Sequence, residues 1–237
     1  MILCHPPDLE QPQGIERLWG QALDDAEVGA DTSLLVLVAA ERSQGAKYAM
    51  YLAAGRSLDA GVSDEFDIVL NGDEHVGLER VILWVNDVPA AGICAAILRH
   101  ELEHACQCRT DPKALEVMNL AEEVVAHAKE GSGVIYNKIP SEVRANASGA
   151  RFSRNLFGDE AIDALVEEFP EFGALLAESW SAALPVEGVV EAILKFIASL
   201  PDLCQRHGFV EVALGEELAA RFRSLVELEE SASADGA

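Results

Sequence analysis

Basic residues are scarce in this sequence of 237 residues, with 17 lysines and arginines against 41 aspartates and glutamates and a formal charge of −24. A surface this acidic repels phosphate backbones and anionic lipid headgroups. We therefore expect neither a nucleic-acid partner nor a membrane partner.

Long apolar runs and secretory features are also missing. No stretch reaches the about 18 uninterrupted apolar residues of a membrane-spanning helix. The segment from Met1 to Pro7 lacks both the basic and the apolar region of a signal peptide. The cysteines are odd in number and scattered, which does not fit a disulfide framework and favours a reducing compartment. We therefore predict a cytoplasmic location. The cysteines are Cys4, Cys94, Cys106, Cys108 and Cys204.

Two common catalytic signatures are absent as well. The sequence contains no glycine-rich phosphate-binding loop and no Gly-x-Ser-x-Gly nucleophile motif. Half of the residues are hydrophobic, as in an ordinary globular protein that buries a core.

Hydrophobic periodicity and turn residues predict alternating helices and strands in the first part of the chain. We expect strands at 33–39, 66–70 and 80–85, with 48–54 ambiguous between strand and helix. Helices are expected at 15–28, 90–108, 112–129 and 140–155.

After residue 157 the composition changes, because 17 acidic and 4 basic residues lie between Gly158 and Ala237. The pattern there is helical, and we expect its helices to be bounded by Pro170, Pro185 and Pro201. The predicted fold is α+β, with a core at 1–157 that contains a small sheet. A helical subdomain at 158–230 and a fraying tail at 231–237 complete the prediction.

The most informative motif is His100-Glu101-Leu102-Glu103-His104, an HExxH pattern inside a predicted helix. Residues four apart lie on one helical face, so His100 and His104 can bind one Zn²⁺ while Glu101 acts as general base. The alternative is a helix with two surface histidines that pair with neighbouring glutamates. Glu103 points away from this face on a helical wheel, and we expect it at the surface.

A catalytic zinc needs a third protein ligand and a position open to water. Glu142 begins a later predicted helix and is the candidate ligand, with Asn146 one turn further along. We expect the Asn146 amide oxygen to accept the ring N–H of a ligating histidine and so fix its tautomer.

This combination of HExxH and a downstream glutamate resembles the gluzincin metallopeptidases. More narrowly, HELEH followed by Glu142-Val143-Arg144-Ala145-Asn146-Ala147 is similar to the ImmA/IrrE group of intracellular peptidases, whose second helix typically reads ExxANxFA. Glu103 stands where that group usually has glycine, and the stretch from Ser148 to Phe152 lacks its usual phenylalanine. The resemblance covers about 80–152 and implies a zincin-like core at 1–157 and a peptide or protein substrate.

The resemblance implies hydrolysis of peptide bonds by zinc-activated water, with Glu101 moving the proton. Tyr136, Arg144 and Arg151 are the candidate donors to a tetrahedral oxyanion. The strand ending at Val85 is either an edge strand that binds the peptide by strand addition or an internal strand.

Two alternatives to an enzyme remain at this stage. One is a zinc-binding regulatory or interaction module without turnover. The other is a purely helical interaction protein whose histidines are incidental.

Overall fold

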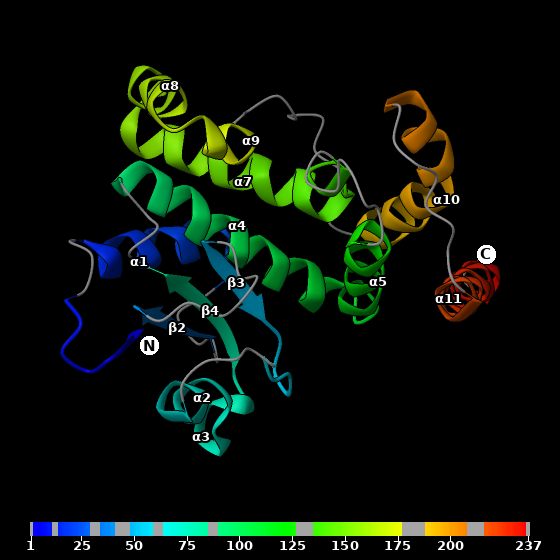
Figure 1. Ribbon diagram of the computed structural model, residues 1–237, viewed down its shortest axis with the longest axis horizontal. Helices are drawn as coiled ribbons and strands as arrows, with labels where there is room; N and C mark the ends of the chain where they lie inside the picture. Colours follow the sequence, from blue (N-terminus) through cyan, green and yellow to red (C-terminus); the bar gives the residue numbers. More distant parts are fainter. Residues whose placement is uncertain are drawn as a thin grey trace. The chain divides into compact units, whose positions relative to one another are not determined.

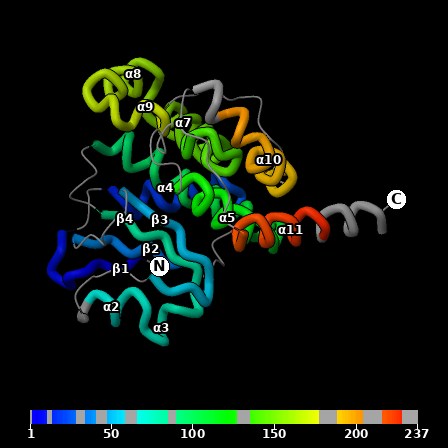
Figure 2. Tube along the Cα trace, turned by 45° about the vertical axis from the view of Figure 1, so that its right-hand side comes forward, coloured from blue at the N-terminus to red at the C-terminus, as the bar shows by residue number. Residues whose placement is uncertain are grey.

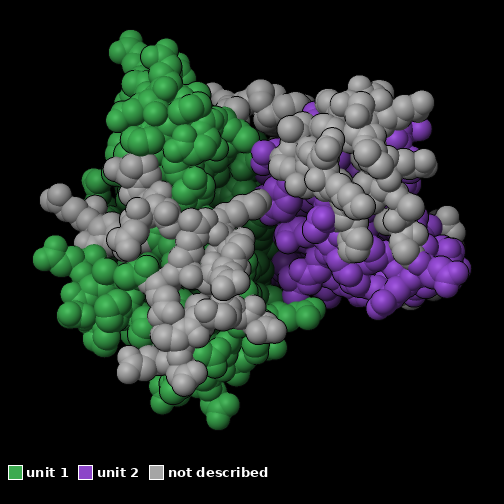
Figure 3. All heavy atoms as spheres, in the orientation of Figure 1, with its two compact units in different colours: residues 1–106, 145–181 green, residues 107–144, 182–237 purple. Residues whose placement is uncertain are grey.

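The structure is a computed structural model that describes residues 2–10, 14–28, 34–40, 48–58, 64–84, 90–126, 135–176, 188–207 and 216–235. The chain divides into two compact units, which Figure 3 colours separately. Unit 1 comprises residues 1–106 and 145–181, and unit 2 comprises residues 107–144 and 182–237. The units do not coincide with the predicted division at residue 157, because each combines two separate segments of the chain.

Unit 1 contains a four-stranded sheet with the strand order β1-β2-β4-β3. Three of its strands, β1, β2 and β4, are parallel, whereas β3 is antiparallel to β4. In the register of the sheet, Val36 of β2 lies opposite Ile2 of β1 and Val81 of β4. The strands are β1 (Ile2–His5), β2 (Leu34–Ala39), β3 (Ala49–Leu52) and β4 (Glu79–Trp84).

Side chains of β2 alternate between two hydrophobic clusters. Val36 and Val38 pack in a cluster that includes residues of α1 (Ile15–Asp25) and α4 (Ala91–Thr110). Leu37 packs in a second cluster on the opposite face. Burial on both faces explains why this parallel strand reads as a continuous apolar run in the sequence.

Helices of unit 1 lie on both sides of its sheet. In Figures 1 and 2, α2 (Asp64–Asn71) and α3 (Asp73–Val76) lie on one side of the sheet and α4 lies on the other. α7 (Pro140–Phe157) lies on the side of α4 that faces away from the sheet. The mixture of a small sheet and many helices confirms the α+β class. The sheet also contradicts the purely helical alternative.

The predicted strand at 66–70 is wrong, because these residues belong to α2. Phe66 and Leu70 are fully buried, whereas the side chain of Ile68 is 68% exposed. A strand would place these three residues on one face, but a helix places residues four apart together and turns the one between them away. The alternation of apolar residues had fitted both geometries.

The other predicted elements of the first part are confirmed within the described residues. The segment 15–28 forms α1, 33–39 forms β2, 80–85 forms β4, 90–108 forms α4, 112–129 forms α5 (Ala114–Ala126), and 140–155 forms α7. The ambiguous segment at 48–54 forms the strand β3. Residues 33, 85 and 127–129 lie outside the described part, and β1 was not predicted.

The second part of the chain is helical, as predicted. Its elements are α8 (Asp159–Glu168), the 3₁₀ helix η2 (Pro170–Phe172), α9 (Gly173–Leu176), α10 (Val189–His207) and α11 (Glu216–Asp235).

One predicted boundary in this part is wrong. Pro201 does not end a helix but lies inside α10, where it removes one backbone N–H donor without stopping the helix. α11 extends to Asp235, and the flexibility of the tail at 231–237 stays a prediction. Pro170 does mark a boundary, since it opens η2, and Pro185 lies outside the described residues. None of the helices described here combines the length and the apolar character needed to cross a bilayer.

Candidate metal centre

The two histidines of the HExxH motif lie side by side on α4. His100 and His104 are both buried, with 9% and 6% of their surface exposed. Their Nε2 atoms are 3.1 Å apart, and the ring planes are nearly perpendicular. α4 is buried on most sides, and its apolar residues from Ile93 to Leu98 hold it in the core of unit 1. The helix thus presents two imidazoles at one point, as the spacing predicted.

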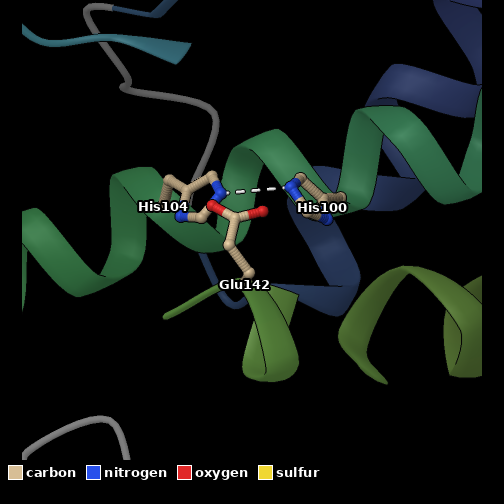
Figure 4. A group of neighbouring side chains, drawn as sticks. All are labelled: His100, His104 and Glu142. Atoms are coloured by element: carbon tan, nitrogen blue, oxygen red, sulfur yellow. Dashed lines mark hydrogen bonds between the residues drawn. The ribbon is translucent and has the colours of Figure 1, made fainter. Parts of the chain in front are cut away.

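Glu142 completes the group from the first turn of α7. One ligand atom from each of Glu142, His100 and His104 can be chosen so that all three lie within 4.8 Å of one another. Figure 4 shows the Glu142 carboxylate pointing toward the space between the two rings. Among the described residues, no other group of three histidines, cysteines or acidic residues has this geometry.

The distances fit a tetrahedral zinc site. With Zn–N bonds of about 2.0–2.1 Å, two nitrogen ligands of tetrahedral zinc lie about 3.3 Å apart. The observed 3.1 Å between the Nε2 atoms is close to that value. The carboxylate needs to approach by at most about 1.5 Å, within the range of a side-chain rotation. Without a metal, the same nitrogen pair fits an N–H···N hydrogen bond between opposite tautomers.

Glu101, the predicted general base, and Asn146, the predicted hydrogen-bond partner of a ligand, are both buried. Each lies close to a ligand in the sequence. Glu101 directly follows His100 on α4 and is 8% exposed. Asn146 lies one turn after Glu142 on α7 and is 7% exposed. The proton-transfer role of Glu101 and the contact of Asn146 with an imidazole stay predictions.

The three candidate oxyanion donors lie in different surroundings. Tyr136 packs against the hydrophobic cluster of unit 2. Arg144 is partly buried on α7, and Arg151 is exposed. Their catalytic role stays a prediction.

Of the two alternatives for β4, the internal strand is confirmed and the edge strand is wrong. β4 lies between β2 and β3 in the sheet, so its backbone groups are paired on both sides. The edge strand next to β4 is β3, which pairs with β4 alone among the described strands.

The predicted surface position of Glu103 is also wrong, since its exposed fraction is only 1%. One of its carboxylate oxygens accepts hydrogen bonds from Arg99 Nη1 at 2.8 Å and from Ser148 Oγ at 3.1 Å. Arg99 also donates from Nε to Asp25 at 2.8 Å. Burial alone would lower the pKa of Arg99, but the carboxylates of Glu103 and Asp25 outweigh it and raise that pKa.

A sequence signal for this buried network was present. Arg99 and Glu103 are four residues apart in a helix that is otherwise apolar from Ile93 to Leu98, the spacing of a helical ion pair. Ser148 occupies the phenylalanine position of the ExxANxFA pattern. Glu103, where the ImmA/IrrE group usually has glycine, and Ser148 are therefore two departures from that group that are in contact with each other.

Comparison with family models, with curated proteins and with solved structures gave no match. What the chain does is therefore inferred from its own residues.

Proposed function

We propose that this protein is a zinc-dependent metallopeptidase with a zincin-like core. The observation that carries the proposal is the convergence of His100, His104 and Glu142. The two histidines lie on α4 and the glutamate on α7, 38 positions after His104 in the sequence. Two imidazoles and one carboxylate make a donor set suited to catalytic zinc, with one position left for water. The HExxH pattern supplies a glutamate beside the ligands.

In the proposed reaction, the zinc ligands and Glu101 have different roles. Bound zinc would supply a Lewis acid that lowers the pKa of a water toward about 7 and polarises a carbonyl. Glu101 accepts a proton from the attacking water and transfers it to the leaving amine. Burial of Glu101 keeps its carboxylate away from bulk water.

A peptide is the substrate that the resemblance implies, and the sheet offers a place for it. In the described part of the chain β3 has a strand partner on one side, and an extended peptide can add to such an edge through backbone hydrogen bonds. No disulfide joins Cys4, Cys94, Cys106 or Cys108, which suits a reducing compartment, and we infer that the enzyme acts in the cytoplasm.

Metal analysis of tag-free protein tests the zinc site. We expect about one zinc per chain in the wild type and in Glu101→Gln, and near zero in His100→Ala. Glu142→Gln should lower zinc affinity by more than the about 10–100-fold that loss of an outer hydrogen-bond partner costs. Glu123→Gln is the matched control, because Glu123 is a partly exposed residue that pairs with Arg221, and it should keep the metal. Wild-type protein without stoichiometric zinc would refute the site.

Cleavage of a peptide library, read by mass spectrometry, tests the catalytic step. We expect cleavage by the zinc-loaded wild type and a loss of at least about 100-fold in Glu101→Gln, since general acid–base catalysis contributes about 10²–10⁴-fold. Cleavage that survives this change contradicts the role of Glu101. A zinc-loaded wild type that cleaves nothing would support the non-catalytic zinc-binding module instead.

A further inference from the structure

Residues that line the contact between α4 and α7 recur at helical spacing. Ser153 Oγ donates to the backbone oxygen of Gly92 at 2.7 Å, near the start of α4. Gly149 comes so close to α4 that a Cβ at this position would lie 2.4 Å from the Ala96 backbone oxygen. The next contact along α4 is that of Glu103 with Ser148. The contact between the two helices is therefore close and uncharged at one end and contains a buried charge next to His104 in the sequence.

A buried carboxylate in a helix interface is costly. Moving an ion out of water costs several kcal/mol, and a buried ion pair is about as stable as an apolar pair of similar volume, or less so. Arg99 compensates the charge of Glu103, and Asp25 of α1 holds Arg99 from the other side. The position of Glu103 is therefore not explained by a gain in stability. It is explained by a role in orienting α7 relative to α4.

The hydrogen bond between Glu103 and Ser148 fixes the register of the two helices. A slip of one residue along α7 would move a side chain by about 1.5 Å and rotate it by about 100°. The Ser148 hydroxyl would then leave Glu103, and the buried carboxylate would lose a donor. Because α7 is one continuous helix from Pro140 to Phe157, the same slip would carry Glu142 away from the imidazoles.

We propose that Glu103 is a positioning residue of the metal centre: held by Arg99, it binds the Ser148 hydroxyl and so fixes the register of α7 that brings Glu142 to His100 and His104. This inference rests on the proposed zinc site. It assigns a role to the Arg99–Glu103–Ser148 network that the HExxH motif does not require.

Ser148→Ala and Ser153→Ala form a matched pair that tests the inference. Both remove one buried hydroxyl of α7 that bonds to α4, but Ser148 contacts the carboxylate next to His104 and Ser153 contacts the far end of the helix. We expect similar losses of thermal stability. Zinc affinity, measured by competition with a chromophoric chelator, should fall about 10–100-fold in Ser148→Ala and stay within about 2-fold in Ser153→Ala.

Two further variants separate positioning from stability. Ser148→Thr keeps the hydroxyl and should restore most of the zinc affinity. Glu103→Ala should match Ser148→Ala in affinity, and the double variant should be no weaker than Glu103→Ala alone, because both changes break one bond. The visible spectrum of the Co²⁺-loaded protein should change in Ser148→Ala and remain that of the wild type in Ser153→Ala.

Each outcome decides between the two claims. Equal zinc affinities of Ser148→Ala and Ser153→Ala, in a wild type that binds zinc, would overturn the positioning role and leave the zinc site intact. Absence of zinc from the wild type would overturn both.

Discussion

Two arginines of unit 1 are buried, and the structure holds them in opposite ways. Arg80, fully buried in β4, donates to the backbone oxygens of Leu70 and Arg56, and burial lowers its pKa. Arg99, on α4, is paired with two carboxylates, which raise its pKa above the ordinary value despite burial. A guanidinium held by carbonyl oxygens serves the local fold, whereas one held by carboxylates ties charged side chains of α1 and α4 together.

Removing Arg99 alone should be more harmful than removing the pair. Arg99→Met leaves Glu103 as an uncompensated buried charge, and we expect a loss of about 3–5 kcal/mol in the free energy of unfolding. Arg99→Met combined with Glu103→Leu removes both charges and should regain part of that loss. Urea unfolding of the metal-free proteins at neutral pH measures both values.

Comparing Arg99→Met with the double variant isolates the cost of the unpaired Glu103, because both variants lose the bond to Asp25. That residue is about a third exposed and can be solvated by water in either variant. A double variant no more stable than Arg99→Met would contradict the assignment of the cost to Glu103.

At the scale of elements, the approach of α7 to α4 depends on the missing side chain of Gly149. The nearest atom to an added Cβ is a backbone oxygen, which cannot rotate away. Gly149→Ala should therefore separate the helices, lower the free energy of unfolding by about 1–3 kcal/mol and weaken zinc binding. Urea unfolding measures the change in the free energy of unfolding, and competition with a chelator measures the change in zinc affinity.

Gly20 provides the matched control for this substitution. It also lies inside a helix, α1, but a Cβ there meets nothing within 4 Å. Alanine is favoured over glycine in a helix by about 0.5–1 kcal/mol, so Gly20→Ala should stabilise the protein. A stabilising effect at Gly149 would show that the helices do not approach as closely as described.

The same elements show what could be predicted from the sequence. The helix around the HExxH motif and the helix that begins at Pro140 were predicted because each has a clear periodic pattern and a recognisable start. His100 and His104 then followed from their spacing on one helical face, whereas Glu142 was proposed as the acidic residue at the start of the later helix. Their convergence in space follows from the same two helices packing against each other.

Other features depended on tertiary contacts that the sequence does not display. β4 became an internal strand because β3, a segment of only four residues, pairs with its free side. Glu103 became buried because Ser148 and Arg99 satisfy its carboxylate, although a helical wheel of α4 alone predicts a surface position. Strand order depends on strands far apart in the sequence, and the burial of Glu103 depends on Ser148, which is 45 positions away.

At the scale of the whole molecule, neither unit is a continuous segment of chain. Unit 2 takes its hydrophobic cluster from α5, which precedes α7, and from α10 and α11, which follow α9. A chain that ends at residue 181 would keep α5 but lose the helices that cover its apolar face. The buried residues of α5 are Ala114, Val117, Met118, Leu120, Ala121, Val124 and Val125.

We therefore expect truncation after residue 181 to expose this face and cause aggregation. Size-exclusion chromatography of the truncated and full chains measures the effect. Leu120→Glu in the truncated chain should restore part of the solubility, because it interrupts the exposed apolar surface. A monomeric, cooperatively folding truncated chain would support instead the predicted division at residue 157.

Removal of zinc should lower the thermal stability of the whole chain. A ligand that binds only the folded state stabilises it by about 2.7 kcal/mol when its free concentration is 100 times Kd. For a protein of 150–250 residues this corresponds to about 5–11 °C in Tm, because each kcal/mol shifts Tm by about 2–4 °C.

The transition that moves should be the one that includes α4, since both histidine ligands lie on that helix. Calorimetry with and without a chelator provides the measurement, and readdition of Zn²⁺ should restore the original Tm. His100→Ala is the control, because a chain that has lost a ligand should respond little to the chelator. A Tm that does not change on chelation of the zinc-loaded wild type, or one that falls equally in His100→Ala, would contradict a zinc ion bound by His100, His104 and Glu142.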